Sequence, residues 1–161
     1  MKTRLVTYDQ IKGYCSEIIR QMVQDNWKPD LIIGITRGGA LPAVMLSHFF
    51  DCKMVGMDVS LRDSEFGPET NCWAAEDAQN GKKILIVDDI NDTGTTINWI
   101  MNDWDCPKGS IQWGENVRFA VVIDNESSRA KIAPQYCGAT INKAVDDAWL
   151  IFCYENWWKS E

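Results

Sequence analysis

The sequence predicts a single α/β domain in which a mostly parallel sheet is flanked by helices on both faces. The apolar runs Leu31–Ile35, Ile84–Val87 and Phe119–Ile123 are typical of strands that are covered on both sides. The expected order of elements is helix, strand, helix, strand, strand, helix, strand, which favours parallel pairing with helical crossovers. The 161 residues, of which 45% are hydrophobic, suffice for one domain with a sizeable core.

Each element is expected from its local pattern. Apolar residues recur at three- and four-residue spacing between Tyr8 and Asn26, which indicates a helix that the proline in Trp27–Asp30 ends. The same criteria predict a strand over Leu31–Ile35, a helix over Ala40–Phe50, a strand over Lys53–Val59, a strand from Ile84, a helix from about Thr95 to Asp103 and a strand over Val117–Asp124. The tail from Gln135 holds short apolar pieces.

The stretch Ser60–Gly81 differs from the rest of the chain. It is polar, contains Gly67–Pro68 and has little apolar periodicity. We therefore expect a long loop, and loops of this length in compact domains are usually functional or mobile.

Composition excludes several classes of function. The net charge of −7 and the lack of a Lys/Arg block disfavour a nucleic-acid partner, and no apolar run is long enough for a membrane span. The six cysteines form no Cys-x-x-Cys pair, and the single histidine, His48, reads as a structural residue at a helix end, so a zinc site is not expected. No signal peptide is recognised, so we expect a cytoplasmic protein with free thiols.

The most informative stretch is Ile84–Thr96. A buried strand leads into the adjacent carboxylates Asp88 and Asp89, at the sheet edge where open α/β folds bind ligands. Asp92–Thr96 then offers backbone N–H groups, hydroxyls and a helix N-terminus, a combination that suits a phosphate. It is neither a Walker loop nor a dinucleotide fingerprint. Alternatively, Asp92 or Thr93 only caps the helix, which leaves the acidic pair unexplained.

A second candidate anion site is the loop Thr36-Arg37-Gly38-Gly39, which follows a buried strand and precedes a helix. Consecutive glycines let a backbone approach an anion closely, and a fixed cation adds charge. Alone, this loop would be read as an ordinary turn. Its place on the βα unit about fifty residues before the acidic motif strengthens the reading as a binding loop.

These motifs resemble those of the type I phosphoribosyltransferases. The family signature is an apolar strand, two acidic residues, two variable residues and Asp-Thr-Gly-x-Thr, all of which Ile84–Thr96 matches. Thr36–Gly39 resembles the family's pyrophosphate loop. Asp146–Trp158 resembles the hood of the xanthine-guanine and hypoxanthine branch, where an Asp-x-Trp-hydrophobic run is followed by an acidic residue six positions after the tryptophan.

The resemblance extends from about Asp30 to Trp158 and implies the type I phosphoribosyltransferase fold: one domain over residues 1–161, with a core of about 1–134 and a small hood of about 135–161. It implies transfer of a 5-phosphoribosyl group from phosphoribosyl pyrophosphate to guanine, xanthine or hypoxanthine, releasing pyrophosphate. Mg²⁺ would bridge the acidic protein and its polyanionic substrate. A homo-oligomer, dimer or tetramer, is also implied.

The resemblance assigns roles to single residues. Asp88 and Asp89 would bind the ribose hydroxyls, and the metal directly or through water. Asp92 would be the general acid/base near N7 of the base. Asp92, Thr93, Gly94, Thr95 and Thr96 would hold the 5′-phosphate. Thr36, Arg37, Gly38 and Gly39 would hold the pyrophosphate, with a strained or cis peptide bond near Thr36–Arg37. Ser60–Gly81 would be a lid, in which Arg62 either reaches a phosphate or is solvated.

The hood would recognise the base. Trp149 would stack on the purine, Glu155 would lie near the C2 substituent, and the backbone of Leu150 and Ile151 would read the base edge. Asn125 stands where the purine enzymes place a lysine that donates to the oxygen at C6. Lys131 and Lys143 are substitutes under a different alignment. Three alternatives stay open: a phosphoribosyltransferase for another base, a non-catalytic phosphoribosyl pyrophosphate-binding regulator, and an α/β interaction module.

Overall fold

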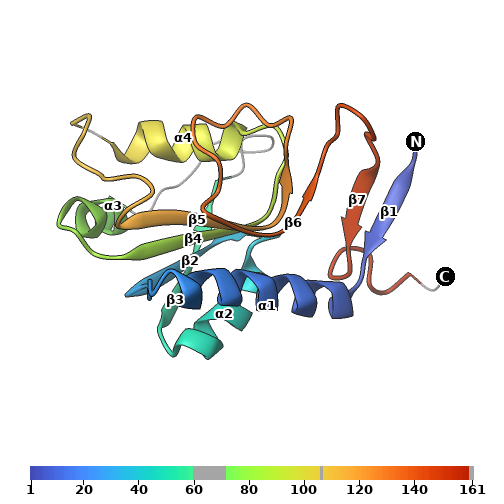
Figure 1. Ribbon diagram of the computed structural model, residues 1–161, viewed down its shortest axis with the longest axis horizontal. Coiled ribbons are helices and arrows are strands. Elements are labelled where there is room, and N and C mark those ends of the chain that lie inside the picture. The colour runs from blue at the N-terminus through green and yellow to red at the C-terminus, as the bar shows by residue number, and fades with distance from the viewer. Residues whose placement is uncertain (60–71, 106, 160–161) are drawn as a thin grey trace.

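The computed structural model describes residues 1–59, 72–105 and 107–159. Its centre is a five-stranded, fully parallel sheet in the order β3-β2-β4-β5-β6 (Figure 1). The strands are β2 (Leu31–Thr36), β3 (Lys53–Asp58), β4 (Ile84–Asn91), β5 (Val117–Asn125) and β6 (Tyr136–Ile141). The predicted α/β class with a mostly parallel sheet is therefore confirmed.

Helices cover both faces of this sheet (Figure 1). Helices α1 (Tyr8–Gln24) and α2 (Ala40–Phe50) pack on one face, where Leu85 and Val87 point into the core. Helices α3 (Cys72–Gln79) and α4 (Thr95–Trp104) pack on the other, against Ile84 and Ile86. Since successive residues of a strand face opposite sides, a central strand has to be apolar where both faces are covered, as Ile84–Val87 of β4 is.

Two helices begin at the carboxyl edge of the sheet, directly after the strands that precede them. Gly39 is the N-cap of α2 and Gly94 is the N-cap of α4, and neither offers a side-chain cap. The first backbone N–H groups of both helices are thereby left near the ends of β2 and β4. This arrangement gives the edge a local positive potential that suits anions.

Helix α3 lies inside the stretch that was predicted to be a loop, so that prediction was wrong for Cys72–Gln79. Its buried anchors, Ala74 and Ala78, are small residues four positions apart, and they give only a weak helical pattern. Residues 60–71 of the expected lid, including Arg62, lie outside the described residues. No helix in the described part of the chain is long and apolar enough to cross a lipid bilayer.

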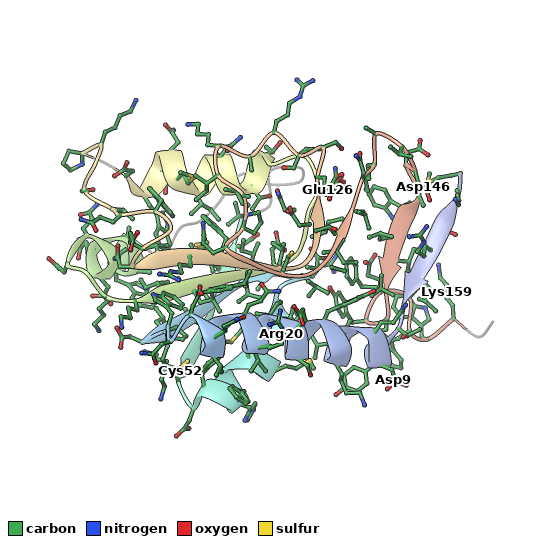
Figure 2. All side chains as sticks on the ribbon, viewed as in Figure 1. Asp9, Arg20, Cys52, Glu126, Asp146 and Lys159 are labelled. Carbon is green, nitrogen blue, oxygen red and sulfur yellow. The ribbon has the colours of Figure 1, made fainter. Side chains whose placement is uncertain are left out.

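A second, two-stranded parallel sheet lies at one end of the molecule and joins the two ends of the chain (Figure 1). It consists of β1 (Thr3–Val6) and β7 (Trp149–Phe152), with Arg4 opposite Leu150. Lys2 and Arg4 also form ion pairs with Asp146, at 3.1 and 3.0 Å, and Asp146 lies beside β1 in Figure 2. These ion pairs are exposed, so their individual contributions to stability are small.

The two sheets do not divide the chain at the expected boundary near residue 134. Strand β6, expected in the hood, pairs with β5 in the main sheet, whereas β1 comes from the N-terminus. We call the β1–β7 sheet and the turn after it, residues 153–155, the hood. Strand β6 is short and its residues differ irregularly in burial, so its sequence shows little periodicity. The sequence pattern therefore did not distinguish β6 of the main sheet from the hood.

Candidate active site

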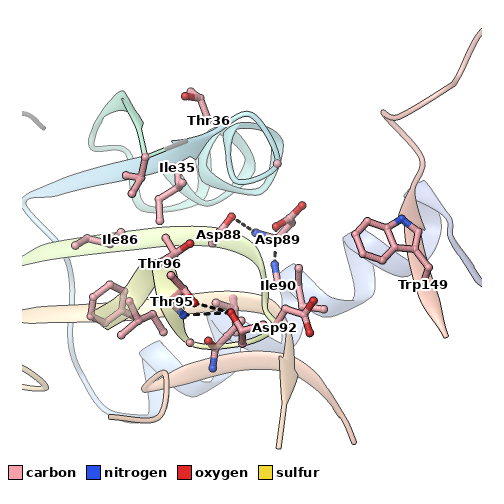
Figure 3. Close-up of a pocket in the computed structure, with 18 residues that line it drawn as sticks. Ile35, Thr36, Ile86, Asp88, Asp89, Ile90, Asp92, Thr95, Thr96 and Trp149 are labelled. Carbon is pink, nitrogen blue, oxygen red and sulfur yellow. Dashed lines mark hydrogen bonds between the residues drawn. The ribbon is translucent and has the colours of Figure 1, made fainter. Parts of the chain in front are cut away.

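A cavity of about 540 Å³ opens at the carboxyl edge of the main sheet (Figure 3). It is formed where β2 and β4 end and where α4 begins. Many of the predicted site residues line it, namely Thr36, Gly38, Asp88, Asp89, Asp92, Thr93, Gly94, Thr95, Thr96 and Trp149. The structure thus brings together residues that are up to 113 positions apart in the sequence, from Thr36 to Trp149.

The loop Thr93–Thr96 forms one wall of the cavity. The Oγ1 atoms of Thr93 and Thr95 lie 2.9 Å apart, and the backbone N–H of Arg129 donates to the carbonyl of Thr93 at 2.9 Å. Gly94 has φ +91°, and a Cβ there would overlap the backbone of Ala130. Glycine is therefore required at this position, and the chain that follows β5 holds the loop in place.

The loop Thr36–Gly39 forms the opposite wall and rests directly on β4. The Thr36–Arg37 peptide bond is cis, as the resemblance implied. A Cβ on Gly38 would overlap the carboxylate of Asp89, and a Cβ on Gly39 would overlap the carbonyl of Val87. The close packing of this loop on β4 therefore requires glycine at both positions. Arg37 is exposed and does not line the cavity.

The acidic pair carries unfavourable charge in the ligand-free protein. Oδ1 of Asp88 accepts the backbone N–H of Asp89 at 2.8 Å, and Oδ1 of Asp89 accepts that of Ile90 at 2.7 Å. Burial, and then the negative charge of Asp89, raise the pKa of Asp88 well above its ordinary value. A cation bound here would relieve this cost.

The same pair fits Mg²⁺. Carboxylate oxygens are hard ligands that this ion prefers, and Mg²⁺ usually binds one or two carboxylates and completes its shell with water and substrate phosphates. Within residues 1–59, 72–105 and 107–159, no group of three or more His, Cys, Asp or Glu side chains is placed to hold a metal alone. Two carboxylates would leave the other positions around the ion to water or to further ligands.

The third carboxylate of the cavity, Asp92, is paired with a lysine. Nζ of Lys143 lies 3.0 Å from Oδ2 of Asp92 and 5.3 Å from the ring centroid of Trp149. The Lys143 side chain is only 16% exposed, although the lysine lies after β6, two strands away from Asp92. Trp149 is 43% exposed and faces Asp89 and Asp92 across the cavity (Figure 3).

Asn125, expected at the base, is buried and hydrogen-bonded within the protein. Its amide N–H donates to the carbonyl of Asp92 at 2.8 Å, and its oxygen accepts from the backbone and hydroxyl of Ser127 and from the backbone of Lys143. The structure therefore does not present this amide to the cavity. Instead, Asn125 fixes the backbone of Asp92 and of Lys143, which brings these two side chains together.

The expected base-reading residues of the hood do not line the cavity, except for Trp149. Leu150 and Ile151 pair with β1, and the carboxylate of Glu155 accepts the backbone N–H of Phe152 at 3.1 Å. Sequence reasoning missed Tyr154, whose hydroxyl donates to the carbonyl of Gly38 at 2.8 Å. Only the position of Tyr154 just after the tryptophan strand could have suggested this contact. Lys143 was named only as an alternative, because β6 was not recognised as a strand.

Comparison with known proteins agrees with this geometry. The family model "Phosphoribosyl transferase domain" matches residues 5–151. Xanthine phosphoribosyltransferase 1 of Saccharomyces cerevisiae is 30% identical over 121 residues, which cover 61% of this chain and 58% of the yeast protein. Xanthine-guanine phosphoribosyltransferase of Cereibacter sphaeroides is 28% identical over 136 residues, covering 81% and 72%.

The fold also matches solved structures. A purine phosphoribosyltransferase from Pyrococcus horikoshii superposes with a TM-score of 0.69 over 100% of this chain and 99% of that one, at 24% identity. This chain therefore belongs to the phosphoribosyl transferase domain family. The curated relatives that it matches include xanthine, xanthine-guanine and hypoxanthine-guanine phosphoribosyltransferases. The chain spans 58% and 53% of the lengths of two yeast relatives.

Proposed function

We propose that this protein is a purine phosphoribosyltransferase that transfers the 5-phosphoribosyl group of phosphoribosyl pyrophosphate to guanine, xanthine or hypoxanthine and releases pyrophosphate. The observation that carries the proposal is one cavity lined by an acidic pair, by residues of two candidate anion-binding loops, and by Trp149 and Asp92, whose carboxylate is paired with Lys143. The names of the matched relatives support this choice of substrate class.

The sugar phosphate would bind along the edge of the sheet. The loop Thr93–Thr96 and the N-terminus of α4 offer hydroxyls and backbone N–H groups to the 5′-phosphate. Asp88 and Asp89 would accept hydrogen bonds from the ribose hydroxyls and take part in binding Mg²⁺. When bound, Mg²⁺ would neutralise charge on the pyrophosphate group that leaves. The loop Thr36–Gly39, next to Asp89, would hold that group.

The base would lie between Trp149 and Asp92. The bond from ribose C1 to the pyrophosphate oxygen breaks, N9 of the purine forms the new bond to C1, and the proton on N7 passes to Asp92. A carboxylate beside the ribose also stabilises the positive charge that develops at C1 in the transition state.

The Asp92–Lys143 pair would favour 6-oxopurines. On such a base, the N7–H donor and the C6 oxygen acceptor are neighbours on one edge. A carboxylate and an ammonium 3.0 Å apart match this order of donor and acceptor. Adenine would turn its C6 amino group toward the ammonium, which has no acceptor. We therefore propose Lys143, in place of Asn125, as the donor to the C6 oxygen.

The cellular setting is proposed from the cysteines. Cys15, Cys52, Cys137 and Cys153 are free thiols in the part of the chain that the structure describes, which supports a reducing compartment such as the cytoplasm. The net charge of −7 supports a small-molecule substrate over nucleic acid. Assembly into dimers or tetramers stays a prediction.

The experiment that tests the proposal is release of pyrophosphate from phosphoribosyl pyrophosphate and Mg²⁺, with guanine, xanthine, hypoxanthine, adenine and uracil supplied separately. Base-dependent release with at least one 6-oxopurine, and much less with adenine and uracil, is expected. Release only with adenine or with a pyrimidine would reject the proposed base. Binding of phosphoribosyl pyrophosphate without release would favour the non-catalytic regulator.

A further inference from the structure

Tyr154 connects the hood to the opposite side of the cavity. Its hydroxyl lies 2.8 Å from the carbonyl oxygen of Gly38 and 3.3 Å from Oδ2 of Asp89. These partners are 116 and 65 residues away in the sequence. Gly38 and Asp89 are themselves in contact, because a Cβ on Gly38 would overlap the Asp89 carboxylate. The phenol thus completes a three-way contact between the hood, the Thr36–Gly39 loop and the acidic pair.

The turn after β7 holds the Tyr154 ring in place. The ring stacks on Phe152 with centroids 5.7 Å apart and an interplanar angle of 10°. Two hydrogen bonds between Glu155 and Phe152 stabilise the turn. The Glu155 carboxylate accepts the backbone N–H of Phe152, and the backbone N–H of Glu155 donates to the Phe152 carbonyl at 2.9 Å. Because the ring and the turn are already fixed, the Tyr154 hydroxyl points at the Gly38 carbonyl without a further loss of side-chain freedom.

We propose that Tyr154 is a positioning residue that holds the Thr36–Gly39 loop in the conformation that binds the pyrophosphate group of the substrate. The inference rests on the proposed function, which assigns that group to this loop. A diphosphate repels exposed carbonyl oxygens, and the Tyr154 hydroxyl gives the Gly38 carbonyl a donor and fixes its direction. Tyr154 touches the loop and the acidic pair and needs no contact with the substrate.

The chemistry of the phenol suits this role. The hydroxyl has one proton to donate, and both of its neighbours, the Gly38 carbonyl oxygen and Oδ2 of Asp89, are acceptors. It therefore acts as a donor to one of two acceptors. Gly38 is the nearer of the two, and the Asp89 carboxylate stays available for ribose or metal.

The test compares Tyr154→Phe with Tyr136→Phe. The first change removes the hydroxyl and keeps the ring. The second removes a hydroxyl that bonds Asp25 at 3.0 Å and Arg118 at 2.7 Å, at the start of β6 and away from the cavity. Both variants lose internal hydrogen bonds, so a comparable loss of unfolding free energy is expected in each. Only Tyr154→Phe should alter binding to the loop.

Calorimetry supplies a readout that does not require catalysis. Tyr154→Phe should weaken binding of Mg²⁺–pyrophosphate and Mg²⁺–phosphoribosyl pyrophosphate by about five- to tenfold, the effect of one lost hydrogen bond. Binding of inosine 5′-monophosphate, which has no pyrophosphate group, should change less than about twofold. Tyr136→Phe should match the wild type with all three ligands.

Unchanged pyrophosphate binding in Tyr154→Phe, or an equal loss for all three ligands, would overturn the positioning role. Failure of the proposed function would look different. In that case the wild type would bind Mg²⁺–phosphoribosyl pyrophosphate without transferring it to any base, while the difference between Tyr154→Phe and Tyr136→Phe persisted.

Discussion

Nζ of Lys143 lies 3.0 Å from Oδ2 of Asp92, although the two residues follow different strands and are 51 positions apart. Both backbones are tied to the side chain of Asn125, which bonds the carbonyl of Asp92 and the N–H of Lys143. A buried amide thus brings an acid and a base together beside Trp149. We propose that this pair selects the purine base and accepts its N7 proton.

Replacing Lys143 by Met tests base recognition. The loss of a charged donor to the C6 oxygen should lower kcat/KM for hypoxanthine by about 10- to 100-fold. Any low activity with adenine should change little, because Lys143 makes no favourable contact with an amino group. Steady-state kinetics with both bases measures the change in selectivity.

Lys131→Met is the matched control, since Lys131 is an exposed lysine that sequence reasoning left as an alternative donor. It should retain the wild-type preference. If Lys131→Met lost activity with hypoxanthine while Lys143→Met kept it, Lys131 and not Lys143 would be the donor to the C6 oxygen.

Replacing Asp92 by Asn tests proton transfer at N7. The amide keeps the size of the carboxylate but cannot accept the proton, so kcat should fall about 10²- to 10⁴-fold. Binding of Mg²⁺–phosphoribosyl pyrophosphate should stay within about threefold, because the acidic pair and both loops are unchanged. Asp103→Asn, an exposed change on α4, serves as control. A fully active Asp92→Asn variant would exclude the acid/base role.

Replacing Asp88 by Asn should stabilise the ligand-free protein while abolishing binding of Mg²⁺–phosphoribosyl pyrophosphate. Burial and the charge of Asp89 raise the folded-state pKa of Asp88, so the folded protein binds more protons than the unfolded chain between the two pKa values. The stability of the wild type therefore falls as pH rises through that interval, and the neutral amide avoids this loss.

Thermal unfolding measures this effect. At neutral pH, Asp88→Asn should unfold roughly 2–4 °C above the wild type for each kcal/mol recovered. The difference should shrink as pH falls below the ordinary pKa of an aspartate, where both states are protonated. A variant that is less stable than the wild type at neutral pH would show that the acidic pair carries no such cost.

Replacing Asn125 by Ala should destabilise the fold and loosen the site together. The change leaves the carbonyl of Asp92 and the N–H groups of Ser127 and Lys143 without this partner, at a cost of about 2–4 kcal/mol. Urea unfolding measures the loss. A change within about 0.5 kcal/mol, which is typical of a surface substitution, would mean that Asn125 is not structural.

Much of the fold could be predicted because the central strands are simple. Strands β2, β4 and β5 contain the apolar runs Leu31–Ile35, Ile84–Val87 and Phe119–Ile123, which are covered on both faces. Strand β6 alternates irregularly between buried and half-buried residues, and α3 is anchored by two alanines, so neither gave a clear pattern. The hood pairs the first strand with the last, a contact that no local pattern contains.

Some residues of the candidate site could be predicted from local motifs, and others could not. Residues contributed by continuous motifs, such as Asp88, Asp89 and Thr93–Thr96, lie together in the cavity as expected. Roles that depend on tertiary contacts were not accessible from one sequence. Alignment by position put Asn125 at the base, whereas its burial commits it to internal hydrogen bonds. Lys143 reaches the same region from the turn after β6, a strand that the sequence pattern did not predict.

The most direct measurement of the central claim is formation of inosine 5′-monophosphate from hypoxanthine, phosphoribosyl pyrophosphate and Mg²⁺, followed by chromatography together with pyrophosphate. We expect equal amounts of nucleotide and pyrophosphate, with adenine converted far more slowly. Phosphoribosyl pyrophosphate that binds but yields no nucleotide with hypoxanthine, guanine or xanthine would contradict it.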